Sequence, residues 1–132
     1  MIVLDTHALV WWVNGSPDLS QSALEAIERG RESRHPVLVS AISAWEIAML
    51  LEKGRMSLAM DLDEWLQTVE SLDGVEWVPV TRQVAVDSVT LPGEFHPDSA
   101  DRIIVALARR ENADLVTADR RIHTYPHIRW IW

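Results

Sequence analysis

The sequence contains no cysteine, which excludes disulfides, thiol catalysis and zinc sites built on thiolates. It has no glycine-rich phosphate loop and no serine in a Gly-x-Ser-x-Gly turn, so neither a nucleotide-binding loop nor a serine hydrolase is indicated. No apolar run reaches the ~20 residues of a membrane span, and the first residues lack the charged segment of a signal peptide. We therefore expect a cytoplasmic protein that makes no contact with membranes.

Positive charge is scarce in this chain. Twelve Lys and Arg residues stand against twenty Asp and Glu residues, and the net charge is −8. This balance argues against binding to nucleic acid, because phosphate favours basic surfaces. The objection weakens if a metal ion neutralises several acids. Pairs such as Arg109/Arg110 and Arg120/Arg121 also remain for contacts with phosphate.

The order of apolar segments predicts a single α/β domain over residues 1–132. With 48% hydrophobic residues, the chain can fill one core. Strand-like runs alternate with helical patterns, which indicates a central, mostly parallel sheet flanked by helices on both faces. The expected strands are residues 1–5, 37–39, 75–80, 115–117 and 128–132. The expected helices are residues 6–13, 20–30, 42–52, 61–72, 82–90 and 98–111.

Four apolar segments each deliver a carboxylate at the place where an α/β fold builds its site. These acids are Asp5, Glu46, Asp101 and Asp119. In open α/β sheets the ligand site lies beyond the carboxyl ends of the strands. Acids gathered there would repel one another, and a divalent cation held by their oxygens removes the repulsion. The pattern therefore predicts a metal site and metal-dependent phosphate chemistry.

Each acid also has a structural alternative, the capping of a helix. Asp5 and Asp98 precede helical segments and suit the N-cap position. Glu46 lies three residues after a serine, which is the spacing of a capping box. Asp119 can cap the turn that follows it. Side chains alternate along a strand, so Thr117 lies on the same side as Asp119 and is a candidate hydrogen-bonding neighbour.

Histidine and tryptophan give weaker signals. The five histidines are expected in surface or packing roles, with His7 and His96 as candidates near the site because they flank two of the acids. Trp11 and Trp12 are adjacent on one short helix, so both can hardly point inward. Either one of them is exposed, in a protein interface or a base-stacking surface, or they are partly buried at the edge of the core. Three tryptophans in periodic apolar segments are expected in the core: Trp45, Trp65 and Trp77.

Short motifs surround the acids along almost the whole chain. They are Val3-Leu4-Asp5-Thr6-His7-Ala8, Ser43-Ala44-Trp45-Glu46-Ile47-Ala48, Asp98-Ser99-Ala100-Asp101-Arg102-Ile103-Ile104-Val105-Ala106 and Leu115-Val116-Thr117-Ala118-Asp119-Arg120. Together, in this order and in so short a chain, they resemble the PIN-domain family, and in particular the VapC-type toxins of bacterial toxin–antitoxin pairs.

The resemblance implies a single PIN-like domain with the activity of a Mg²⁺- or Mn²⁺-dependent endoribonuclease. Such a toxin cleaves RNA, is inhibited by a cognate antitoxin and is usually a homodimer. The implied catalytic and metal-binding quartet is Asp5, Glu46, Asp101 and Asp119. In the mechanism that we expect, Asp5 and Asp101 are direct ligands, while Glu46 and Asp119 hold coordinated water or a second cation.

Further residues around the quartet are expected to assist it. The auxiliary candidates are Thr6, Asp98, Arg102, Thr117 and Arg120, of which the two arginines would contact phosphate. Two positions depart from the family pattern. His7 stands where Ser or Asn is usual, and Ser99 stands where Pro is usual. Neither departure removes an acid, although His7 alters the polar surroundings of Asp5.

Two other functions remain open at this point. A Mg²⁺-dependent phosphatase with an Asp nucleophile would place a second Asp two residues after the first, where this chain has His7. An acidic protein-binding module would carry the same acids without cleaving RNA. The sequence identifies neither the RNA target nor the antitoxin, and it does not distinguish one metal ion from two.

Overall fold

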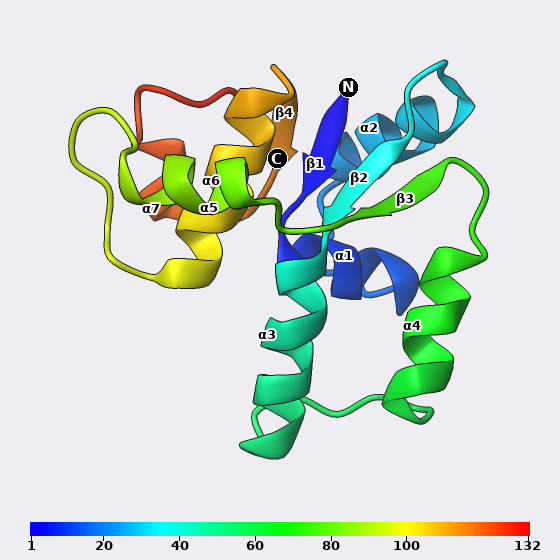
Figure 1. Ribbon diagram of the computed structural model, residues 1–132. Coiled ribbons are helices and arrows are strands. Elements are labelled where there is room, and N and C mark those ends of the chain that lie inside the picture. The colour runs from blue at the N-terminus through cyan, green and yellow to red at the C-terminus, as the bar shows by residue number, and fades with distance from the viewer.

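The computed structural model describes residues 1–132 and contains one five-stranded sheet surrounded by seven helices (Figure 1). All strand pairs are parallel, so the expected α/β class is confirmed. The strands are β1 (Ile2–Leu4), β2 (Val37–Ser40), β3 (Val75–Val78), β4 (Asp114–Val116) and β5 (Trp130–Ile131). The helices are α1 (Thr6–Val13), α2 (Gln21–Glu32), α3 (Ala41–Glu52), α4 (Leu62–Glu70), α5 (Arg82–Val89), α6 (Ser99–Arg110) and α7 (Arg120–His123).

Strand β1 lies in the middle of the sheet, whose order is β3-β2-β1-β4-β5. Val3 pairs with Leu38 of β2 on one side and with Leu115 of β4 on the other. The second pairing continues past the strand, because the backbone N–H of Asp5 donates to the carbonyl of Val116 at 3.0 Å. The ends of β1 and β4 are therefore fixed side by side at the carboxyl edge of the sheet.

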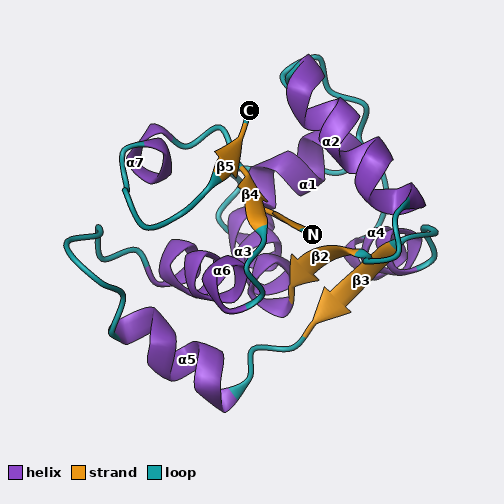
Figure 2. Cartoon of the chain, turned by 90° about the horizontal axis from the view of Figure 1, so that it is seen from above, coloured by secondary structure: helices purple, strands orange, loops and turns teal.

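The alternation of side chains along the strands divides the core into two layers, one on each face of the sheet (Figure 2). Ile2 and Leu4 of β1 pack with residues of α1, α2 and α4, whereas Val3 packs with residues of α5 and α6. The first layer contains the fully buried Trp65 of α4, and the second contains the fully buried Ile104 of α6. Both faces are thus covered, as a parallel sheet requires.

Every helix begins at a side chain that accepts a backbone N–H of its first turn. Hydroxyl oxygens do this at Ser20, Ser40 and Thr81, and carboxylates do it at Asp5, Asp61, Asp98 and Asp119. Because two of these caps follow the central strands β1 and β4, helix capping itself fixes acids at the carboxyl edge. No helix combines the length and the apolar character that crossing a membrane requires.

Two helices differ from the sequence-based expectation. The pattern predicts an end at Gly30, but α2 continues to Glu32. A Cβ at Gly30 would lie 2.9 Å from Cγ2 of Val37, so this glycine permits close packing of α2 on the sheet and does not end the helix. Helix α7 was not predicted as an element, because four residues are too few to show an apolar period.

The tryptophans are only partly where the pattern places them. Trp65 is buried as expected, whereas Trp45 is 54% exposed, so the prediction of a core position for it is wrong. Helix α3 extends away from the sheet (Figure 1), and Trp45 lies on the side of α3 that lines a cavity with Asp98 and Ala100. Trp77 packs against the core but is only partly buried. Trp11 and Trp12 are both half-buried, and Trp12 packs against the core, so the alternative of partial burial at the edge of the core is confirmed for α1.

Candidate metal centre

The four predicted acids meet at the carboxyl edge of the sheet. Asp5 follows β1, Asp119 follows β4 after two residues, Glu46 lies on α3 and Asp101 lies in the first turn of α6. All four line one cavity of about 200 Å³. The remaining polar residues of the wall are Thr6, His7, Asp98 and Arg121.

Asp5 is held from two sides. Its side chain is 2% exposed. Oδ1 accepts the backbone N–H of Thr6 at 2.8 Å, which is the helix cap, and Oδ2 accepts the hydroxyl of Thr117 at 2.7 Å. Oγ1 of Thr117 in turn accepts the backbone N–H of Asp119 at 3.0 Å. The capping and functional interpretations of Asp5 are therefore compatible, and Thr117 links the positions of two acids.

Glu46 is oriented by Thr6 and not by a capping box. The hydroxyl of Thr6 donates to Oε1 of Glu46 at 2.5 Å and lies 2.8 Å from the hydroxyl of Ser43. A hydroxyl has one proton, so Ser43 is the donor in the second contact. Helix α3 begins at Ala41, so Ser43 lies inside the helix and the capping-box alternative is wrong. Burial raises the pKa of Glu46 despite the opposing hydrogen bond from Thr6, and the charge of Asp5 adds to the rise.

Asp101 has the most perturbed carboxyl group in the cavity. Burial, followed by the negative charges of Asp5, Asp98, Glu46 and Asp119, raises the pKa of Asp101 to about 8. Its backbone N–H donates to Oδ1 of Asp98 at 3.0 Å, so Asp98 caps α6. Without a cation the carboxyl of Asp101 therefore keeps its proton at neutral pH, which is a direct sign of crowded negative charge.

Asp119 is paired with an arginine that sequence reasoning did not place in the site. Nη2 of Arg121 lies 2.9 Å from Oδ2 of Asp119 and 3.2 Å from Oδ2 of Asp101. Burial alone would raise the pKa of Asp119, but the hydrogen bonds and the charge of Arg121 outweigh burial and lower it. The arginine side chain is 60% exposed, so it reaches in from solvent. In the sequence, Arg121 is only one half of a basic pair. Its place in the cavity depends on α7, which was not among the predicted helices.

His96 also lies against the acids. Its Nε2 is 3.3 Å from Oδ2 of Asp101, and the ring is 16% exposed. Both ring nitrogens are buried, and neither makes a hydrogen bond. Burial, and then the charge of Arg121, lower the pKa of His96, so the ring is neutral at pH 7. Ligand atoms of His96, Asp101 and Asp119 all lie within 4.8 Å of one another.

His7 borders the cavity at Asp5. Its Nε2 accepts the backbone N–H of Ala118 at 3.0 Å, so the neutral ring carries its proton on Nδ1, 3.7 Å from Oδ2 of Asp5. The ring also packs against Trp11 and Trp132, with centroid distances of 5.1 and 6.3 Å. His7 thus joins the loop after β4 to the aromatic side chains beside the site.

The two arginines predicted to contact phosphate have other surroundings. The guanidinium of Arg102 donates to four backbone carbonyls, those of Ser88, Val89, Phe95 and His96. It therefore holds the loop before α6 with four of its five N–H groups, and only one N–H of Nη2 is left for a phosphate. Arg120 is exposed, and its side chain makes no hydrogen bond or ion pair. Its neighbour Arg121 is the arginine that faces the cavity.

The residues present fit a divalent cation. Carboxylate oxygens are the ligands that Mg²⁺ and Mn²⁺ prefer, and a single imidazole is compatible with Mn²⁺. Burial, and then the charges of the neighbouring acids, raise the pKa of Asp101, and a cation beside its oxygens would oppose both effects. The guanidinium of Arg121, between Asp101 and Asp119, marks a point where positive charge is stabilised.

The fold and the site together define a class of protein, an α/β domain with an acidic cavity at the carboxyl edge of its sheet. The family model of the PIN domain matches residues 2–128, and this chain belongs to that family. The resemblance seen in the four motifs is thereby confirmed.

Known relatives agree with this assignment. A protein of Mycobacterium tuberculosis named Ribonuclease VapC22 is 39% identical over 128 residues, which cover 97% of this chain and 94% of the relative. Two solved structures share the fold at lower identity. The VapBC2 complex of Rickettsia felis, bound to a promoter DNA fragment, has a TM-score of 0.71 and 21% identity, covering 98% of this chain and 97% of that one. VapC20 of M. tuberculosis, described as a toxin that cleaves the sarcin–ricin loop, has a TM-score of 0.64 and 14% identity, covering 98% and 99%.

Proposed function

We propose that this chain is a metal-dependent endoribonuclease that acts as the toxin of a toxin–antitoxin pair. The ribonuclease relative, 39% identical over nearly the whole chain, supports the activity. The single observation that carries the proposal is the convergence of four acids from separate elements on one cavity of a PIN fold. The reaction is hydrolysis of an RNA phosphodiester bond in the cytoplasm.

The cofactor is Mg²⁺ or Mn²⁺, held by Asp5, Glu46, Asp101 and Asp119. A bound cation activates water for attack on phosphorus and neutralises the charge that develops in the transition state. Asp5 and Asp101 are the direct ligands, since both are buried at the base of the cavity. Glu46 and Asp119 lie nearer to solvent and orient water or a second cation.

Several other residues of this chain prepare the site. Thr117 and Thr6 fix the two oxygens of Asp5, and Thr6 also fixes Glu46, so the carboxylates are oriented before substrate arrives. The carboxyl of Asp101 would hold a cation in its deprotonated form. Arg121, which now pairs with Asp101 and Asp119, would be available for a phosphate of the RNA once positive charge replaced it there.

The partner is an antitoxin that covers the cavity. The structural relative from Rickettsia felis is a VapBC complex, which supports a partner of this kind. On this chain the exposed tryptophan beside the site is Trp45, which lines a cavity of about 270 Å³ together with Glu46 and Asp98. The contact surface is therefore assigned to α3 and not to Trp11 and Trp12 of α1. A homodimer is the expected toxin assembly.

The phosphatase and binding-module alternatives have less support. The position that a phosphatase would give to a second Asp is held by His7, whose Nε2 is already engaged by the backbone of Ala118. A module that only binds a protein has no need of a carboxyl group with a pKa of about 8 in a cation-sized cavity.

The test is cleavage of RNA by the purified chain with Mg²⁺ or Mn²⁺. Asp5→Asn should abolish cleavage, and Asp18→Asn, at an exposed position outside the cavity, should leave it unchanged. RNA that stays intact with the wild-type chain and both metals would overturn the nuclease. Release of phosphate from a phosphate monoester in the same samples would favour the phosphatase instead.

A further inference from the structure

We propose that His96 is a nitrogen ligand of the cation that Asp101 and Asp119 hold, so that this centre selects Mn²⁺ over Mg²⁺. The inference rests on the proposed metal-dependent function and goes beyond the acidic quartet. It concerns one residue, at the end of the loop before α6, that no other part of the mechanism uses.

The positions of the three side chains suit a shared cation. In an octahedral site with bonds of ~2.2 Å, adjacent ligand atoms lie about 3.1 Å apart and opposite ones about 4.4 Å apart. Nε2 of His96 is 3.3 Å from Oδ2 of Asp101. The ligand atoms of His96, Asp101 and Asp119 all lie within 4.8 Å of one another. These separations are close to those of neighbouring ligands around one metal ion.

The imidazole of His96 lacks the partner that a buried polar group requires. Both ring nitrogens are buried without a hydrogen bond, although nearly all buried polar atoms in proteins have one. The short distance from Nε2 to Asp101 makes no hydrogen bond, because the atoms are not aligned for it. A bound cation would supply the missing partner of the imidazole and would also account for its close approach to Asp101.

Arg121 gives an independent sign of a cation position. Its Nη2 lies within 3.2 Å of both Asp101 and Asp119, which are two of the three side chains that would share the cation. No hydrogen bond joins the guanidinium to either ring nitrogen of His96, both of which lack a partner. A metal ion at this point would satisfy all three side chains, whereas Arg121 satisfies only two.

The identity of the metal follows from the ligand type. Mg²⁺ prefers oxygen ligands and retains its waters, whereas imidazole is a better ligand for the transition metals from Mn²⁺ onward. A centre with one histidine should therefore bind Mn²⁺ about tenfold or more tightly than Mg²⁺. Replacing the imidazole should remove this preference and leave Mg²⁺ affinity nearly unchanged.

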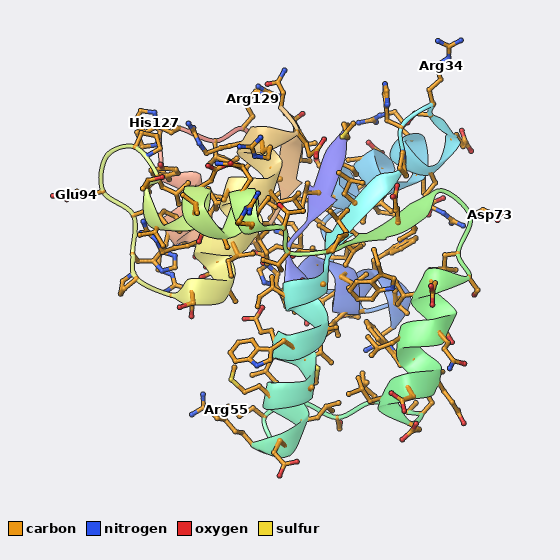
Figure 3. All side chains as sticks on the ribbon, viewed as in Figure 1. Arg34, Arg55, Asp73, Glu94, His127 and Arg129 are labelled. Carbon is orange, nitrogen blue, oxygen red and sulfur yellow. The ribbon has the colours of Figure 1, made fainter.

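The experiment is electron paramagnetic resonance of Mn²⁺ bound to the full chain, without RNA. The wild-type spectrum should show coupling to a ¹⁴N nucleus, and His96→Gln should lose the coupling together with about tenfold or more of the Mn²⁺ affinity. His35→Gln is the matched control. Its exposed side chain lies next to Arg34, which stands at the top of the molecule in Figure 3, at the end where β2 begins and away from the acids.

The outcomes separate this inference from the proposed function. A wild-type spectrum without ¹⁴N coupling overturns the role of His96 even if the His96→Gln protein is unstable, because no variant is needed for that result. If Asp101→Asn loses Mn²⁺ while His96→Gln retains both the affinity and the preference for Mn²⁺, His96 is not a ligand and the acidic centre stands. If the wild-type chain binds neither Mn²⁺ nor Mg²⁺, the centre and the proposed function fail with it.

Discussion

Asp101 makes the folded protein sensitive to pH. Its pKa is about 8 in the fold and 3.8 in the unfolded chain, because burial and four neighbouring acids oppose its charge. Between these values the folded state binds a proton that the unfolded state has lost, so stability falls as pH rises. The loss begins near pH 4 and is complete near pH 8. Arg121 and metal ions act against it, since both bring positive charge to the same oxygens.

Asp101→Asn should therefore stabilise the metal-free protein. Asparagine resembles the protonated acid, so the variant and the wild type should be equally stable near pH 4. The variant should be more stable by on the order of 1–3 kcal/mol at pH 8. Urea unfolding in the presence of a chelator measures the difference, with Asp18→Asn as a control that changes one exposed acid. A stability gap that does not widen with pH would contradict the assigned pKa.

Arg121→Gln should tighten metal binding. The arginine competes with a cation for Asp101 and Asp119, and two largely exposed ion pairs contribute about 1 kcal/mol together. Its removal should lower the Kd for Mn²⁺ about fivefold and weaken binding of RNA. Calorimetric titration measures the Kd for Mn²⁺. Arg120→Gln is the matched control, since this neighbouring side chain makes no contact in the cavity, and equal effects of the two changes would show that only net charge matters.

For single residues, the sequence predicts the positions of the acids better than it predicts the contacts of the arginines. Asp5 and Asp119 follow apolar strands and cap helices, so both their position and their orientation are set locally. Arg102 and Arg121 are equally plausible as phosphate ligands in the sequence. The role of each arginine depends on which acceptors its guanidinium reaches at the end of a long, flexible side chain. Arg102 reaches the carbonyls of Ser88 and Val89, and Arg121 reaches Asp101, in segments that only the tertiary fold brings near.

The turn between α4 and β3 depends on Gly74. Its φ is +79°, and a Cβ there would lie 2.5 Å from the carbonyl oxygen of Arg31 at the end of α2. The glycine therefore lets the start of β3 pass against the neighbouring helix. The sequence predicts the end of α4 and the start of β3 to within a few residues. It does not predict that α2 continues past Gly30, because the contact between Gly30 and Val37 joins two elements and leaves no signal in the local sequence.

Gly74→Ala should destabilise the fold more than Gly54→Ala does. Both glycines have positive φ, but the space around Gly54 is open. The left-handed conformation alone should cost about 1–2 kcal/mol in each variant, and the contact with Arg31 should add about 1–3 kcal/mol for Gly74→Ala. Thermal and urea unfolding test the difference. Similar losses in the two variants would mean that the backbone of α2 moves aside easily.

The whole molecule should be stabilised by its cation. A metal ion that binds only the native state at a hundred times its Kd adds about 2.7 kcal/mol. In a domain of this size that corresponds to a rise in Tm of roughly 10 °C. The measurement is a melting curve with and without Mn²⁺ at pH 8, where the carboxyl of Asp101 has lost about half of its proton occupancy. No shift for the wild type, or an equal shift for Asp101→Asn, would count against a centre built on these acids.

The pairing of β1 with β4 also determines when the protein can act. During synthesis β1 is made first, but Thr117, which holds Asp5, follows 112 residues later. Until then β1 lacks one of its two neighbours, and Asp101 and Asp119 do not yet exist beside it. A nascent chain that lacks the segment from Asp101 to Asp119 therefore has no complete acidic centre, however well its first helices fold. A fragment that ends before this segment should leave RNA intact, so a truncated translation product of this chain is harmless.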